Sequence, residues 1–318
     1  MRGRPVPERA VVIALCLCAL ACGLFLTLGA RGDWSFVLAF RGQKLVALLV
    51  VATAVALSTV AFQTVTGNRI LTPSIMGFDA LYLLIQTGLV FGLGGVGVAM
   101  LGAIPRFMME TTLMLGAALA LFAALMRRSD DLGRLVLTGI IFGILFRSLT
   151  SLINRLIDPS EFAVVQAASF ARFNAVEADI LWIAAGATSL ATALLWTRHD
   201  RLDVVALGRE TAIGLGVDHD REARRTMGLV AVLVSVSTAL VGPVVFFGLL
   251  VSALVHAVAG TWRHAVLLPL AALVSSTILV GGQTIFERVL SLQTSVSVVI
   301  EGIGGVVFLL LVLKGHAR

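Results

Sequence analysis

Four ionisable residues fall inside apolar runs, where a charge is costly and therefore marks a candidate functional position. They are Asp79, Arg147, His256 and Glu301. Such groups could relay protons, but Asp79 and Glu301 lie within a turn or two of predicted helix ends, where water lowers the cost of the charge. We assign Arg147 and His256 to a possible translocation path, with Arg147 the better candidate for facing a polar, acidic cargo.

The motifs of common enzymes and cofactor sites are either missing or out of context. Gly92, Gly94 and Gly97 have the spacing of a dinucleotide-binding turn, but they end an apolar run and do not follow a strand. The sequence has no phosphate-binding G-x(4)-G-K-[ST] loop, no zinc motif and no Ser/His/Asp grouping. We therefore expect no enzymatic activity, no cofactor bound by this chain and no metal site, and any driving energy must come from a partner or an ion gradient.

The composition indicates a chain that spans a membrane many times. It has 318 residues, 58% hydrophobic and only 13% charged, with mean hydropathy +1.01, whereas a soluble domain carries about 25% charged residues. The net charge of +6 comes from scattered Lys and Arg without a dense basic face, so we expect no nucleic-acid partner. Cys16, Cys18 and Cys22 share the first apolar run and are interpreted as small packing residues.

Apolar runs of about 20 residues, the length that crosses a bilayer, predict an all-α protein of about ten transmembrane helices. The predicted spans are 10–30, 45–65, 75–96, 107–126, 135–157, 178–197, 227–246, 248–261, 265–283 and 295–313. Most Lys and Arg residues fall on the side that holds both ends, so both termini are predicted to be cytoplasmic. Ten spans permit two inverted halves of five within a single membrane domain of residues 1–318.

The longest polar interruption on the predicted cytoplasmic side runs from Arg198 to Arg225. Within it, Leu207, Thr211 and Leu215 recur every four residues, as on one face of a short helix. Such a helix is marginal alone and needs a surface to pack on. It lies either on its own helix bundle or in a partner that delivers mechanical work.

This stretch carries a resemblance to a known family. Leu207-Gly208, Ala212 and Leu215-Gly216 resemble the cytoplasmic coupling segment of the vitamin B12 and iron–siderophore ABC permease family, here about residues 205–217. Gly242-Pro243 through His256 is similar to that family's GP-x-x-F-x-GL-x-x-P-H signature, although 252–255 lacks the usual proline. Arg41-Gly42-Gln43-Lys44 resembles the family's R-x-x-R, and Gln63 with 68–77 its continuation.

The resemblance implies a permease of the bacterial inner membrane that imports iron–siderophore complexes without changing them chemically. Stretches such as FQTVTGNRILTPSIMGFDALYLLIQT look like the subgroup for catecholate-type siderophores. The implied partners are ABC ATPase subunits that bind ATP-Mg, a periplasmic or lipid-anchored siderophore-binding protein, and an identical or related second permease. The residues implied for ATPase coupling are Leu207, Gly208, Glu210, Thr211, Ala212, Leu215 and Gly216.

The resemblance also places Arg41, Lys44 and Arg288 where the family's basic residues meet acidic residues of the binding protein. Ordinary cations near helix ends are the alternative interpretation of these three. For the whole chain, the alternative function is a secondary transporter that uses a proton or sodium gradient through Asp79, Glu301 or Arg147.

Overall fold

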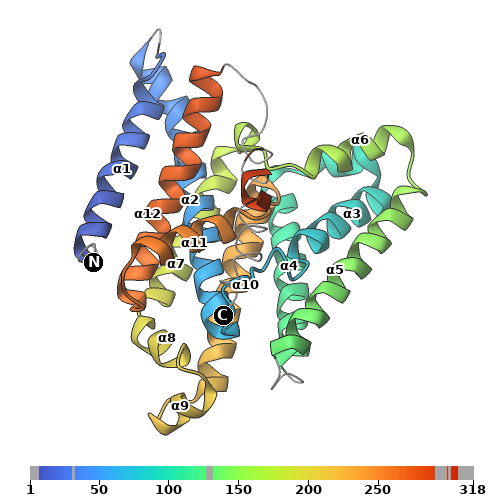
Figure 1. The fold of residues 1–318 in the computed structure, drawn as a ribbon. Coiled ribbons are helices and arrows are strands. Elements are labelled where there is room, and N and C mark those ends of the chain that lie inside the picture. The colour runs from blue at the N-terminus through green and yellow to red at the C-terminus, as the bar shows by residue number, and fades with distance from the viewer. Residues whose placement is uncertain (1–6, 31–32, 127–131, 291–298, 300–301, 307–318) are drawn as a thin grey trace.

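The computed structural model describes residues 7–30, 33–126, 132–290, 299 and 302–306, and these residues form helices and connecting turns without a strand (Figure 1). The membrane-length helices are α1 (Pro7–Thr27), α2 (Trp34–Thr66), α3 (Phe78–Met100), α4 (Ala103–Met126), α5 (Leu132–Asn154), α7 (Ala178–Trp196), α10 (His219–Val241) and α12 (His264–Thr284). The shorter elements are α6 (Pro159–Ala168), the 3-10 turn η1 (Phe173–Ala175), α8 (His199–Val205), α9 (Arg209–Gly214), α11 (Phe247–Val258) and the π-helical turn η2 (Ile285–Val289).

The expected helical membrane fold is confirmed, and eight of the ten predicted spans correspond to helices long and apolar enough to cross a membrane. The eighth predicted run, 248–261, is short for a full crossing by its sequence, and it forms α11, which has 12 residues and so rises only about 18 Å. The last predicted span, 295–313, lies mostly outside the described residues, as does Glu301. The second prediction began too late, since α2 starts at Trp34 and includes both Arg41 and Lys44.

The bundle has two ends. In Figure 1 the N-terminal end of α1 is the lower end of that helix, and α8 and α9 lie below it; this side is called the inner end, because the distribution of Lys and Arg predicts it to be cytoplasmic. The turn between α1 and α2, the C-terminal end of α12, and α6 lie at the opposite, outer end.

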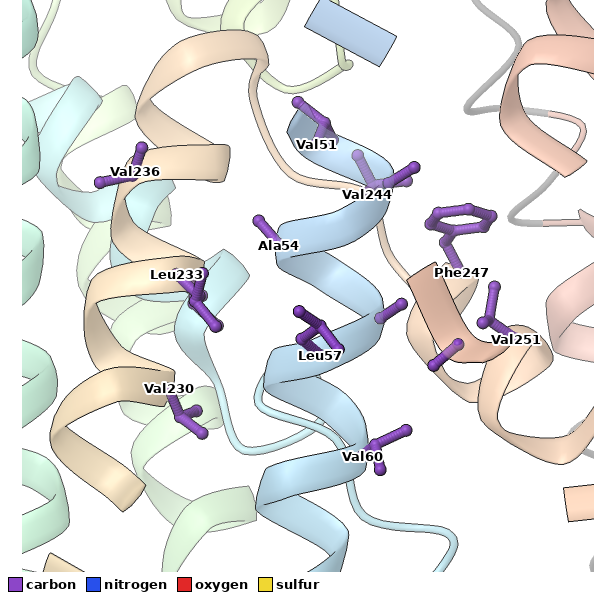
Figure 2. Close-up of a cluster of buried hydrophobic side chains, with 14 of the residues drawn as sticks. Val51, Ala54, Leu57, Val60, Val230, Leu233, Val236, Val244, Phe247 and Val251 are labelled. Atoms are coloured by element: carbon purple, nitrogen blue, oxygen red, sulfur yellow. The ribbon is translucent and has the colours of Figure 1, made fainter. Parts of the chain in front are cut away.

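Helix α2 forms the centre of the molecule. The apolar stretch of α2 that could cross a membrane is 72% buried, the largest share among the eight described spans. This helix packs against α7, α10, α11 and α12. Figure 2 shows Leu57 of α2 near Leu233 of α10, while Phe247 and Val251 of α11 lie on the other side of α2. Dispersion contacts and small residues, and not a hydrophobic force, hold such helices together in lipid.

The helices α3, α5 and α6 form a second group, which α4 connects to α10 (Figure 1). The turn before α3 packs tightly on α5: a Cβ atom on Gly77 would lie only 2.8 Å from the Gly143 Cα atom. By contrast, Cβ atoms on Gly88 and Gly92 of α3 would meet nothing within 4 Å. Gly77 and Gly143 therefore allow the turn before α3 to approach α5 closely.

The glycine-rich run from Gly92 to Gly97 forms a kink within α3. Gly94 has a φ of 73°, and the Glu161 carboxylate of α6 accepts a hydrogen bond from the Gly95 N–H at 2.9 Å. This contact replaces helical bonding that the kink breaks. These glycines are thus part of helix geometry, in agreement with our rejection of a dinucleotide site.

Candidate coupling and translocation sites

The predicted coupling segment forms the tip of the inner end, with α8 leading into the two-turn helix α9 (Figure 1). Leu207, Ile213 and Leu215 are 58%, 55% and 60% exposed at this tip, whereas Ala212 is fully buried beneath them. The other predicted coupling residues are also exposed, namely Gly208, Glu210, Thr211 and Gly216. If this tip lies in the cytoplasm, as predicted, its exposed apolar surface has no lipid to cover it and is suited to a protein partner.

Ion pairs hold this tip to α10. Glu222, in the first turn of α10, is only 3% exposed and accepts hydrogen bonds from Arg198 at 2.9 Å and Arg201 at 2.7 Å. Arg225 completes the cluster at 2.8 Å. A buried carboxylate needs such partners to remain charged, so the cluster fixes the start of α8 to α10.

His264 connects α8 to two further core helices. It lies at the start of α12 with 2% exposure; its Nδ1 atom is 2.6 Å from Asp203 Oδ1 of α8, and its Nε2 atom is 2.7 Å from Thr64 Oγ1 of α2. The His264 backbone N–H also donates to Asp203 at 2.7 Å. Direct hydrogen bonds therefore join α8 to α12, and α12 to α2, at His264.

Arg41, one of the three predicted docking cations, is directed into the protein. Its side chain is among the buried ones, with 7% exposure, and donates to the carbonyl oxygens of Phe25, Leu26, Leu28 and Gly29 at 2.9 to 3.3 Å. The last carbonyls of a helix have no partner within the helix. In this conformation Arg41 caps α1, and its docking role remains a prediction.

Lys44 and Arg288 lie near the same outer end. Lys44 pairs with Glu287 of η2 and also contacts Asn174 of η1, while Glu287 accepts a hydrogen bond from Gln283 at 2.7 Å. Arg288 follows Glu287 on the π-helical turn and is half-buried. The structure therefore brings the three predicted docking cations to one end of the bundle, with two of them already engaged within the chain.

Arg147 lies on the exposed face of α5. This span is the least buried of the eight described, at 11%, and Arg147, Ser148, Ser151 and Arg155 line a groove of about 430 Å³ along it. Spacings of one, four and eight residues from Arg147 place these side chains on one helix face. Two arginines and two serines on one face are unsuited to lipid and indicate a partner helix or an aqueous path.

His256, the other predicted path residue, lies elsewhere. It is half-buried on α11, and its ring centroid lies 5.7 Å from that of Trp262. The Arg69 guanidinium carbon lies over the Trp262 ring, 4.1 Å from the ring centroid. Its described contacts are thus at the inner end, and the groove on α5 does not include it.

Sequence reasoning missed several members of these networks. Asp203, Glu222 and His264 were not singled out, because most of their partners are distant in the sequence. Ile213 could have been found, since it lies within the family-like stretch beside Ala212. Ser151 and Arg155 could also have been found from their helical spacing with Arg147.

The geometry describes a helical membrane protein with an apolar inner tip and one polar helix face. Residues 10–314 match the FecCD transport family, and the chain belongs to that family.

Among its relatives, the petrobactin import system permease protein YclO of Bacillus subtilis (strain 168) is 40% identical over 306 residues, which cover 96% of both chains. The petrobactin import system permease protein FatC of Bacillus anthracis is 34% identical over 278 residues, covering 87% of this chain and 78% of the relative. A solved inward-facing structure of a metal-chelate type ABC transporter has the same fold, with a TM-score of 0.83 over 97% of this chain and 100% of that one at 21% identity.

Proposed function

We propose that this chain is the membrane-spanning permease subunit of an ABC importer that moves iron–siderophore complexes across the bacterial inner membrane. Membership of the FecCD transport family supports this proposal, as does similarity to two permeases named for petrobactin import. The cargo class that these relatives favour is a ferric complex of a catecholate-type siderophore. ATP-Mg binding and hydrolysis belong to separate ATPase subunits.

The observation that carries the proposal is the link between the apolar tip and the helix core. The exposed Leu207, Ile213 and Leu215 offer a docking surface, and α8 behind them is bonded to α10 through Glu222 and to α12 and α2 through His264. Movement of a docked ATPase would therefore displace helices and not merely a loop. A binding protein outside and a second permease complete the proposed assembly.

The polar face of α5 supplies the proposed cargo path. The second permease would cover this face and leave the groove at Arg147 and Arg155 between the two subunits. Their guanidinium groups would attract an acidic chelate, and the serine hydroxyls would replace part of its hydration. The iron stays ligated by its siderophore throughout, so no metal site of the protein is required.

Reconstitution tests this function directly. The chain is co-expressed with candidate ATPase and second-permease subunits from the same operon and placed in proteoliposomes with the binding protein and a radiolabelled ferric catecholate complex. Uptake that requires ATP and the ATPase subunits supports the proposal. Uptake by this chain alone, driven by an ion gradient, would reject it.

One observation favours the alternative function, a transporter driven by an ion gradient, and justifies testing it in the same uptake experiment. Asp79 lines a cavity of about 20 Å³ with the hydroxyl-bearing Ser58, Thr59, Ser237 and Thr238. A cavity of this size holds about one water molecule or small ion. Asp79→Asn should leave ATP-driven uptake intact if the importer mechanism holds, and should abolish uptake if a cation gradient drives it.

A further inference from the structure

A second cavity, separate from the α5 groove, lies towards the outer end between α3, α4 and α6. It has a volume of about 390 Å³ and its walls include Gln86, Arg106, Arg172 and apolar residues of α6 such as Val164. We call it the Gln86 chamber. Neither the coupling path nor the predicted docking cations use it.

Gln86 presents an unused donor to this chamber. Its side chain is 1% exposed, and its Nε2 atom is buried without a hydrogen-bond partner among the described residues. A buried donor without an acceptor has lost its hydrogen bonds to water and therefore destabilises the fold. A ligand that offers an oxygen acceptor would remove this cost.

The other polar groups of the chamber wall are also donors. Arg106 donates from Nε to Glu110 at 2.8 Å, but a guanidinium has five N–H donors in total. Arg172 is exposed and has no acidic partner within 4 Å among the residues that the structure describes. Its backbone N–H donates to Val241, which fixes the Arg172 backbone beside the chamber.

The charge balance of the site favours an anion over water. Arg106 and Arg172 contribute two positive charges, and the buried Glu110 compensates one of them. The remaining positive charge, on the exposed Arg172, attracts an anion with a strength that depends on the salt concentration. Planar guanidinium groups match the geometry of phosphate and carboxylate oxygens.

We propose that the Gln86 chamber binds an oxyanion, which accepts hydrogen bonds from Gln86 Nε2 and from the guanidinium groups of Arg106 and Arg172. The bound anion joins α3, α4 and the segment after α6, so it holds α6 in place over α3. Phosphate oxygens can come from an anionic lipid headgroup of the outer leaflet or from a free oxyanion in solution.

Binding can be measured on the purified full chain without any transport assay, so the result is independent of the proposed function. In one arm, the protein is reconstituted in nanodiscs of phosphatidylcholine with or without phosphatidylglycerol, and retained lipid is counted by native mass spectrometry. In the other arm, the melting temperature in a neutral detergent is followed as sodium phosphate is added, against sodium chloride of equal ionic strength.

Gln86→Leu removes the buried donor and Arg172→Gln removes the unpaired charge. Arg224→Gln is the matched control, because it removes an exposed positive charge at the inner end. Because Arg172 is exposed, Arg172→Gln should fold normally and tests the site even if Gln86→Leu misfolds. The melting temperature of each variant without ligand shows whether it is folded.

Retention of phosphatidylglycerol that falls at least five-fold in both chamber variants, but not in Arg224→Gln, identifies a lipid headgroup as the source. A phosphate-specific rise in melting temperature, lost in the same two variants, identifies a free oxyanion. The proposal is overturned if the wild type shows neither effect, or if the chamber variants respond like the wild type.

Discussion

The Nδ1 atom of His264 lies 2.6 Å from the Asp203 carboxylate, joining α12 to the helix that precedes the coupling tip. The same imidazole contacts Thr64 of α2 at 2.7 Å. Three elements that are far apart in the sequence therefore meet at one buried side chain. These contacts form a bonded route from α8, behind the apolar tip, to the most buried of the described spans.

We predict that Asp203→Asn uncouples ATP hydrolysis from uptake, because the amide binds the imidazole less strongly than the carboxylate does. Uptake in proteoliposomes should fall about ten-fold, while hydrolysis by the ATPase partners continues. Asp200→Asn is the matched control on the same helix, since the Asp200 side chain is 88% exposed. Equal losses in the two variants would contradict the linking role of Asp203.

The Asp203→Asn and His264→Gln variants should also be non-additive. Residues in direct contact couple by about 0.5–3 kcal/mol in a double-mutant cycle. We expect the double variant to lose little more uptake than either single variant, because each one already breaks the same link. Fully additive losses would show that the two residues act separately.

Leu215→Asp should disrupt docking of the ATPase without affecting the fold, because Leu215 is 60% exposed at the tip. Co-purification of the ATPase subunits and coupled uptake should both fall by ten-fold or more. Ala212→Asp is the less informative variant, since Ala212 is fully buried and a charge there destabilises the tip itself. Normal ATPase co-purification with Leu215→Asp would argue against a docking surface.

Arg41→Gln should lower the stability of the permease, because four carbonyl oxygens of the α1 end lose their donor. A buried polar group without a partner typically lowers the free energy of unfolding by about 1–3 kcal/mol. This loss should be measurable as a lower melting temperature in detergent. An unchanged melting temperature for Arg41→Gln would refute the capping role.

Arg288→Gln is the cleaner test of docking, and it should weaken binding of the siderophore-binding protein most at low salt.

Gly77→Ala should destabilise the contact between the turn before α3 and α5. The new Cβ would lie 2.8 Å from the Gly143 Cα, and the φ of 96° at Gly77 disfavours alanine. We expect a loss of about 1–3 kcal/mol in thermal unfolding. Gly88→Ala is the control, since its Cβ would meet nothing within 4 Å, and an equal loss there would remove close packing as the cause.

The sequence by itself determined the class of fold and the family. Membrane insertion depends on the mean hydropathy of runs of about 20 residues, which is a local property. The short helix around Ala212, in the stretch predicted to couple to an ATPase, was also found from sequence, because its formation follows local residue spacing. The match of eight predicted spans to described helices reflects this local control.

Only the tertiary structure decided which polar residues are paired and which are free. In the sequence, Arg41 and Lys44 are equivalent cations near the start of a predicted span. In the structure, Arg41 caps α1, whereas Lys44 pairs with Glu287. The partners of His264 likewise come from other helices, namely Asp203 of α8 and Thr64 of α2. In a low-polarity interior, the free energy of a charged or polar side chain depends on the atoms within a few ångströms of it, and chain folding alone brings those atoms together.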